Sequence, residues 1–237
     1  MTHLIDMKNV IVERDGTRVL DGVSMHLERG ERLAIIGSNG AGKTTFLRAL
    51  IGLQKISGGH IEAFGRPRQR EDDFRDMRLR AAYLFQDADD QLFCPSVVED
   101  VAFGPLNQGF SEEEAMDKAR ATLARLGLSA LSARVTRKLS GGEKRLVCLA
   151  AILAMDPEVL LLDEPTNSLD AHHVEKLVEI LSSLDIAMII VSHDRPVLDR
   201  LASRALLMKN GQLEPAVLHR HPHMHEHVHI HADHDHS

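Results

Sequence analysis

The chain has 237 residues, of which 43% are hydrophobic and 27% are charged, and its formal net charge at pH 7 is -7. A chain of this size can bury one sizeable core and leave room for a smaller lobe. The mildly acidic balance argues against a nucleic-acid-binding surface as the main function.

The first third of the chain is predicted to form short strands, because its apolar stretches are separated by glycines. A glycine-rich turn then leads into a helix that starts at Lys43 and ends near Leu53. No helix or strand is predicted in the charged stretch at 66–80. The predicted strands of this part are 10–12, 19–27, 32–36, 60–64 and 81–85.

The middle of the chain is predicted to be helical. Ser111 and Glu114 have the spacing of a capping box, and apolar residues follow at helical intervals until Gly127. A second helix opens at Ser140, runs to about Met155 and is broken by the proline that follows.

The last third alternates strands and helices. The run 159–162 is continuously apolar, which is typical of a parallel strand that is buried on both faces. Asp170 is expected to cap a helix to about 184, and a strand at 186–191 and a hairpin at 204–213 follow. This alternation predicts an α/β fold with a mainly parallel sheet, to which an antiparallel β subdomain and a helical subdomain are added.

One domain is therefore expected over 1–218, with the helical subdomain at about 87–155. The remaining residues, 219–237, form a low-complexity tail that is predicted to be disordered.

A glycine-rich segment between a predicted strand and a predicted helix fits the phosphate-binding P-loop pattern. Backbone N–H groups of such a loop curl around phosphates, and the helix N-terminus favours anions. Lys43 is expected to reach the β- and γ-phosphates of ATP, and Thr44 to bind Mg²⁺. The segment consists of Gly37, Ser38, Asn39, Gly40, Ala41, Gly42, Lys43, Thr44 and Thr45.

Two carboxylates, Asp163 and Glu164, follow the apolar strand directly. Ligand sites of parallel sheets lie at this end of the strands. Asp163 suits Mg²⁺, held directly or through water, and Glu164 suits the general base that orients the water attacking the γ-phosphate.

The ordered motifs resemble those of the ATP-binding-cassette (ABC) ATPases over roughly residues 4 to 215. Besides the P-loop and the acidic pair, the chain carries a segment similar to the family's signature at 139–143. The glutamine, the Ser-Leu-Asp segment and the histidine of the family are matched by Gln86, 168–170 and His193. The resemblance implies a P-loop NTPase core of the RecA-like type.

The resemblance also implies roles for these residues. Gln86 would touch Mg²⁺ or the attacking water, and His193 would contact the γ-phosphate. Asp170 would cross the interface of a dimer. The signature, which comprises Ser140, Gly141, Gly142 and Glu143, would bind the γ-phosphate held by a second ATPase subunit, so that two chains, expected to be identical, enclose two ATP molecules.

Two positions depart from the family pattern. The signature ends in Glu143 where the family usually has glutamine, so an extra negative charge lies near the nucleotide. The first strands lack the aromatic residue that usually stacks on adenine. Glu13 or Arg14 stands about where it is expected, and Arg14 can stack through its guanidinium plane.

The segment from Gln86 to Pro105 resembles the ATPases of energy-coupling-factor importers, which take up vitamins, cobalt or nickel. In that group the segment grips coupling helices of a separate membrane protein. The resemblance implies a transmembrane coupling subunit and a substrate-binding membrane subunit as partners, and a peripheral position on the cytoplasmic face of the membrane. The longest apolar runs fall well short of the roughly 20 residues of a membrane helix, so no span is expected in this chain.

Cys94 and Cys148 lack metal-ligand spacing and are expected to be thiols of a reducing compartment.

The tail contains nine histidines that mostly alternate with other residues. Neutral imidazoles bind borderline metals such as Ni²⁺ and Co²⁺, so the tail is a candidate metal-binding segment, with nickel as first choice and cobalt as second. Its histidines are His219, His221, His223, His225, His227, His229, His231, His234 and His236. Five histidines outside the tail are expected to be incidental: His3, His26, His60, His172 and His173.

The function predicted from these features is the ATPase of a divalent-metal importer. Three alternatives stay open: the ATPase of another importer, a soluble ABC ATPase that acts on nucleic acid or ribosomes, and a metal-binding protein with a regulatory cassette. ATPases of the nucleic-acid type usually carry a long coiled-coil insertion or a second cassette. The segment 87–138 is too short for such an insertion, and no nucleic acid is expected as partner.

Overall fold

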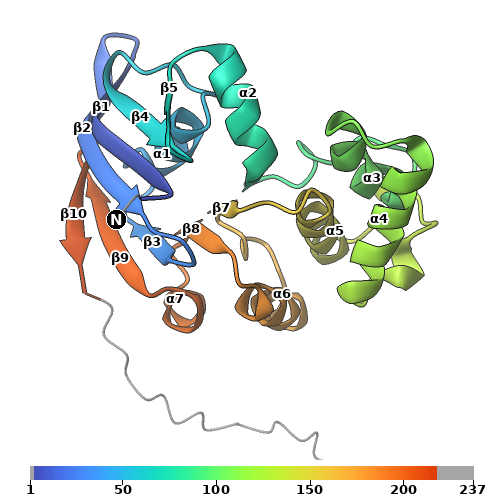
Figure 1. Ribbon diagram of the computed structural model, residues 1–237. Coiled ribbons are helices and arrows are strands. Elements are labelled where there is room, and N and C mark those ends of the chain that lie inside the picture. The colour runs from blue at the N-terminus through green and yellow to red at the C-terminus, as the bar shows by residue number, and fades with distance from the viewer. Residues whose placement is uncertain (1–2, 218–237) are drawn as a thin grey trace, which may run out of the picture.

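The computed structural model describes residues 3–217, and its strands form two sheets (Figure 1). The smaller sheet is antiparallel and has the strand order β2-β1-β4-β5. It is built from β1 (Ile5–Arg14), β2 (Thr17–Leu27), β4 (Gly58–Ala63) and β5 (Arg66–Arg68).

The larger sheet is parallel except at one edge. Its strand order is β10-β9-β3-β8-β7-β6, and only β10 runs antiparallel to its neighbour. Its strands are β3 (Arg32–Ile36), β6 (Ala81–Leu84), β7 (Val159–Asp163), β8 (Ala187–Val191), β9 (Arg204–Lys209) and β10 (Gln212–Ala216).

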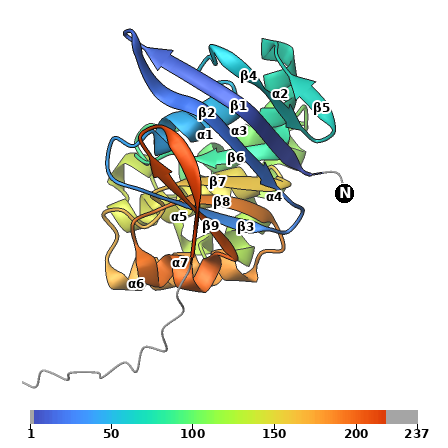
Figure 2. The same cartoon turned by 90° about the vertical axis from the view of Figure 1, so that its left-hand side faces the viewer.

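The central strands of this sheet are buried on both faces, as their continuous apolar runs predict. Alternate residues of each strand enter different cores. In β7, Val159 and Leu161 pack towards the antiparallel sheet, whereas Leu160 and Leu162 pack among the helices of the opposite face. Figure 2 shows α6 (Ala171–Ser183) and α7 (Arg195–Leu201) below the parallel sheet and the antiparallel sheet above it.

Three helices form a lobe beside the sheets (Figure 1), and their buried residues share one core with a face of the parallel sheet. They are α3 (Val97–Asn107), α4 (Glu112–Arg125) and α5 (Gly141–Leu153). The predicted capping box starts α4: the backbone N–H of Ser111 donates to Glu114 Oε2 at 2.9 Å, and Ser111 Oγ accepts from the Glu114 N–H at 3.3 Å. The prediction of a parallel core with an antiparallel and a helical addition is thus confirmed.

Element boundaries differ from the sequence prediction in several places. The charged stretch at 66–80 contains β5 and the helix α2 (Glu71–Arg80), which buries only Met77 and so lacks an apolar face that the sequence could reveal. The helix α1 (Lys43–Leu50) ends before Leu53, because the N–H groups of Leu53 and Gln54 turn back to the carbonyl of Arg48. The short α7 was not predicted.

The parallel strands β3, β6, β7 and β8 end at one edge of the sheet, and the segments that carry the predicted site residues begin there. Between residues 3 and 217, no helix combines the length and the apolarity needed to cross a membrane. The tail at 219–237, with its candidate metal ligands, lies outside the described residues.

Candidate functional site

A cavity of about 430 Å³ lies at this edge of the parallel sheet. The loop after β3, the start of α1 and the ends of β6 and β7 line it, so it collects residues that are far apart in the sequence. Its lining residues are Arg14, Val19, Asn39, Gly40, Gly42, Lys43, Thr44, Thr45, Gln86, Asp163, Glu164 and Val191. Most of the predicted P-loop and the acidic pair are therefore brought together.

The glycine-rich loop wraps around the ammonium group of Lys43. Lys43 is 7% exposed, and its Nζ donates to the carbonyl oxygens of Gly37 at 2.8 Å and Ser38 at 3.0 Å. A side chain at Gly37 would collide with the carbonyl of Met208, so the tight turn after β3 requires glycine. The loop ends at the N-terminus of α1, whose first N–H groups have no partner within the helix and favour anions.

Oxygen donors converge at the end of β7. Asp163 is fully buried, and its Oδ1 accepts from Thr44 Oγ1 at 3.3 Å while its Oδ2 accepts from Tyr83 Oη at 2.8 Å. Burial, followed by the nearby Asp163 charge, raises the pKa of Tyr83, so this phenol stays a hydrogen-bond donor. A carboxylate and a hydroxyl beside a phosphate loop match the hard oxygen ligands that Mg²⁺ prefers.

Glu164 and His193 form the second polar pair of the site. His193 Nδ1 lies 2.9 Å from Glu164 Oε2, and the histidine side chain is 71% exposed whereas that of the glutamate is 11% exposed. The backbone of Glu164 has a φ of 47°, in the sparsely populated left-handed region, and its N–H donates to the carbonyl of Val191 at 2.8 Å. The loop after β7 thus holds the carboxylate at the cavity.

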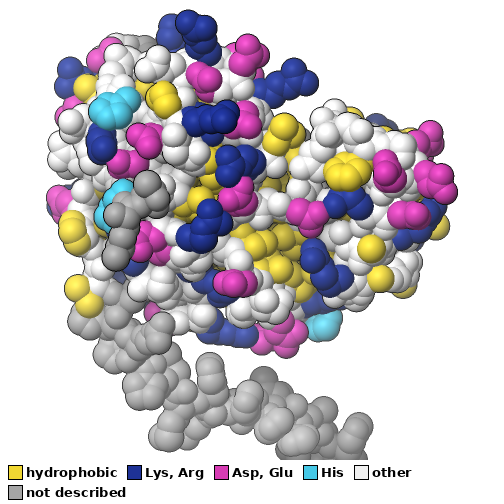
Figure 3. Space-filling model, viewed as in Figure 1, with side chains coloured by type: hydrophobic (Ala, Val, Ile, Leu, Met, Phe, Trp, Pro, Cys, Tyr) yellow, Lys and Arg dark blue, Asp and Glu magenta, His cyan; other side chains and the backbone are white. Residues whose placement is uncertain are grey.

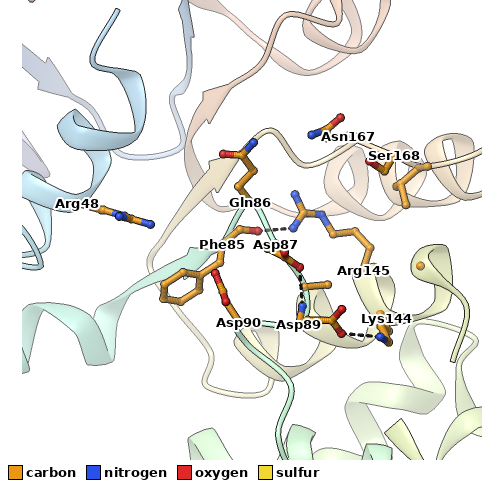
Figure 4. A pocket seen from close by; sticks show the side chains of 13 residues that line it. Arg48, Phe85, Gln86, Asp87, Asp89, Asp90, Lys144, Arg145, Asn167 and Ser168 are labelled. Carbon is orange, nitrogen blue, oxygen red and sulfur yellow. Dashed lines mark hydrogen bonds and ion pairs between the residues drawn. The ribbon is translucent and has the colours of Figure 1, made fainter. Parts of the chain in front are cut away.

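Gln86 lines this cavity and also a second one, of about 430 Å³, on the side of the helical lobe (Figure 4). Figure 3 shows this face of the molecule hollowed between the sheets and the lobe. Lys144 of α5 borders the second cavity and pairs with Asp89 at 2.5 Å.

Arg14, the candidate adenine contact, lines the first cavity, and its side chain is 80% exposed.

The signature residues are not among those that line the phosphate cavity within the described part of the chain. Ser140 caps α5: its N–H donates to Glu143 Oε2 at 2.8 Å, and its Oγ accepts from the Glu143 N–H at 3.3 Å. Glu143 Oε1 also accepts from Arg134 at 2.5 Å. The Ser140 N–H, together with Arg134, lowers the pKa of the Glu143 carboxyl.

Gly142 of the signature segment lies directly against His173 of α6. A side chain at Gly142 would collide with the ring of His173, and Asp170 accepts from His173 through both its backbone N–H at 3.0 Å and its Nδ1, 2.8 Å away. Asp170 therefore caps α6, as predicted, and does not reach the phosphate cavity of its own chain.

Two residues of the site escaped the sequence analysis. Tyr83 is the single tyrosine of the chain, and its place three residues before Gln86 on a buried strand is the signal that could have marked it. Arg145 is 3% exposed and donates to backbone carbonyls at the ends of both β6 and β7. No spacing rule reveals it, because its partners are backbone atoms.

Neither cysteine takes part in the site. Burial raises the pKa of Cys148 to about 12 and that of Cys94 to about 11, so both thiols are protonated at neutral pH.

A family model described as ABC transporter matches residues 20–167. An ABC transporter ATP-binding protein of Brucella suis biovar 1, whose name states no substrate, is 58% identical over 221 residues, which cover 93% of this chain and 92% of the relative.

Two relatives from Rhodobacter capsulatus carry a substrate in their names. The cobalt import ATP-binding protein CbiO is 44% identical over 84% of this chain and 72% of its own length. The nickel import ATP-binding protein NikO is 38% identical over 91% of this chain and 89% of its own length.

The fold also matches solved structures. CbiO1 from Clostridium perfringens, described as part of the ABC transporter complex CbiONQ, superposes with a TM-score of 0.79 at 34% identity and covers 90% of this chain and 88% of its own.

Proposed function

Since this chain belongs to the family of ABC transporter ATPases, which couple ATP hydrolysis to transport, we propose that it powers the uptake of a divalent transition metal through separate membrane subunits. The observation that carries the proposal is the cavity that collects the phosphate loop, Asp163 and Glu164 around Lys43. The fold and the family account for ATP binding.

The phosphate loop and Lys43 would bind the β- and γ-phosphates of ATP. Backbone N–H groups of the loop and of the start of α1 would donate to the phosphates, and the Lys43 ammonium would exchange the carbonyls of Gly37 and Ser38 for phosphate oxygens. Arg14 would lie against the adenine. Thr44 and Asp163 would hold Mg²⁺, with Gln86 at the edge of the site; the ion supplies neutralisation of phosphate charge.

Glu164 would act as the general base. Its carboxylate is held at the cavity mouth beside His193, where it can accept a proton from a water aligned with the γ-phosphate. His193, most of whose side chain is exposed, would turn from Glu164 to the γ-phosphate once ATP is bound. The proton would move from the water to the Glu164 carboxylate as the water oxygen bonds to the γ-phosphorus, while the bond from that phosphorus to the oxygen bridging the β-phosphate breaks and ADP leaves.

The signature residues would complete the site of a second copy. Ser140, Gly141 and Gly142 form a helix N-terminus that lies outside the chain's own phosphate cavity, so they are free to bind the γ-phosphate of a partner, with Asp170 at the contact. The Arg134 guanidinium neutralises Glu143, which supports activity despite the missing glutamine. Two identical chains would then enclose two ATP molecules.

Nickel is the first choice of cargo and cobalt the second. The support consists of the CbiO and NikO relatives and of the nine tail histidines, His219 to His236, which offer imidazole ligands. The partners would be a coupling subunit and a metal-binding subunit of the membrane, with this chain on the cytoplasmic face. We assign the cassette to 1–218, with the helical subdomain at about 87–155, and the metal-binding tail to 219–237.

The substitution Glu164→Gln tests the catalytic assignment. It removes the base but keeps the shape, so ATP binding should persist while the hydrolysis rate falls at least about 100-fold. The ATP-loaded variant should accumulate as a dimer in size-exclusion chromatography. Glu175→Gln, which alters an exposed ion pair with Arg200, is the matched control and should hydrolyse ATP normally. Near-normal turnover in Glu164→Gln would refute the role of Glu164.

A further inference from the structure

Two histidines and a glutamate meet at the end of the antiparallel sheet that is remote from the phosphate loop. We propose that His3, His26 and Glu28 form a binding site for a divalent transition-metal ion. One ligand atom from each of the three side chains lies within 4.8 Å of the others. The inference does not depend on the transport proposal, because it concerns neither the ATP cavity nor the tail.

The strands bring these residues together. His26 and Glu28 are two residues apart at the end of β2, so their side chains point to the same face, and Leu27 between them points into the core and is fully buried. The N–H of Leu4 donates to the carbonyl of Leu27 at 2.8 Å. This bond fixes the segment before β1 against the end of β2, which places His3 beside the other two ligands.

The geometry is close to that of a metal site. His3 Nδ1 and Glu28 Oε1 are 4.0 Å apart, and the rings of His3 and His26 have centroids 4.4 Å apart with planes inclined by 34°. Ligands at metal distances of 2.0–2.2 Å in a tetrahedral site lie about 3.4 Å from each other, so small side-chain rotations close the site.

One ligand atom lacks a partner. Among the described residues 3–217, His3 Nδ1 is shielded from solvent and has no hydrogen-bond partner. A buried polar atom without a partner costs free energy, and a bound cation would satisfy it. The guanidinium of Arg204 lies next to the candidate metal site, where it donates to Glu31 at 2.5 Å and to the backbone carbonyl of His26 at 2.6 Å. Its charge is therefore matched by Glu31.

The donor set selects the class of ion. Two imidazoles and one carboxylate suit borderline divalent ions such as Zn²⁺, Ni²⁺ and Co²⁺, and are a poor match for Mg²⁺ or Ca²⁺, which prefer oxygen ligands. Three protein ligands leave one position of a tetrahedral ion open. The site is thus expected to exchange its metal with solution.

The site is separate from ATP. The strand β1 runs from Ile5 to Arg14, and at about 3.3 Å per residue its ends are roughly 30 Å apart, with Arg14 at the phosphate cavity and His3 just ahead of the other end. A metal bound there would tie the segment before β1 to β2. Because it binds the folded chain, it would raise thermal stability, and the gain would grow with the logarithm of the metal concentration once the site is saturated.

Calorimetry with Zn²⁺ alone as the probe tests the site. The background is the full-length chain with all nine tail histidines changed to asparagine, so that the tail does not contribute. This chain should bind one equivalent of Zn²⁺, and its melting temperature should rise on titration. His3→Asn, His26→Asn and Glu28→Gln should each weaken binding roughly tenfold or more, since even outer partners of metal ligands are worth 10–100-fold.

His60→Asn is the matched control, because His60 is an exposed histidine on the neighbouring strand β4. It should bind Zn²⁺ as the background does. Melting without metal shows that each variant is folded. Unchanged Zn²⁺ affinity in folded His3→Asn and Glu28→Gln, or no bound equivalent in the background chain, would overturn the proposal; because ATP hydrolysis is not measured, neither result bears on the transport assignment.

Discussion

A single buried guanidinium joins the ends of the two strands that precede Gln86 and Glu164. Arg145 of α5 donates to the carbonyls of Pro165 at 2.8 Å, Glu164 at 2.6 Å and Asp163 at 3.1 Å, and to that of Phe85. Burial lowers the pKa of Arg145, yet an arginine remains charged at neutral pH. The fork of donors thus fixes the loops that carry both Gln86 and Glu164.

We expect Arg145→Lys to destabilise the fold by about 3 kcal/mol, because one ammonium cannot reach carbonyls on both strands and leaves buried acceptors without donors. Urea unfolding followed by circular dichroism measures the loss. Arg125→Lys, at an exposed position of α4, is the matched control and should change stability by less than about 0.5 kcal/mol. Equal midpoints for the two variants would refute the role of Arg145.

The residues that could be predicted are those whose chemistry depends on local sequence. The P-loop, the acidic pair and the capping residues Ser111, Ser140 and Asp170 are recognised by short spacings, and the structure places them where these spacings require. The candidate metal site that contains His3 and His26 could not be predicted, because only the pairing of β1 with β2 brings these residues together.

At the scale of elements, prediction succeeded where burial imposes a pattern. The strands β7 and β8 are buried at every position and were found from their apolar runs. The helix α2 was missed because seven of its ten residues are charged; acidic residues in its first turn and arginines in its last complement the helix dipole. Such charge complementarity leaves no periodic apolar signal.

The start of the helical lobe presents apolar side chains to solvent. Phe93 is 62% exposed, and it packs edge-on against Phe103 of α3, with ring centroids 4.7 Å apart. Leu106 and Phe110 are also exposed nearby in the sequence. Exposed aromatic residues in the segment that resembles the importers' docking region make it our candidate contact with a membrane partner.

The substitution Phe93→Ser should therefore lower nickel uptake by cells at least about fivefold, while the purified chain hydrolyses ATP at its normal rate, because the change lies outside the nucleotide cavity. Leu53→Ser, which alters an exposed apolar residue beyond the end of α1, is the control and should transport normally. Unimpaired uptake in Phe93→Ser would argue against docking through this residue.

For the molecule as a whole, the tail and the folded cassette are expected to act separately. Changing all nine tail histidines to asparagine should reduce the number of Ni²⁺ ions bound per chain, because the imidazole ligands are lost, and should leave the ATPase rate unchanged. Calorimetry with Ni²⁺ and a phosphate-release assay measure the two effects. An unchanged nickel stoichiometry would refute the metal-binding role of the tail.

Gln86 belongs to two cavities at once, one with the phosphate loop and one beside the helical lobe. If filling one cavity moves this side chain, the free energies of filling the two are linked, and such a linkage is reciprocal. A membrane partner that strengthened ATP binding about fivefold would itself be held about fivefold more tightly by the ATP-loaded chain. The assembled transporter would then be most stable with ATP bound and would dissociate more readily after hydrolysis. The Gln86 side chain would couple the two binding equilibria.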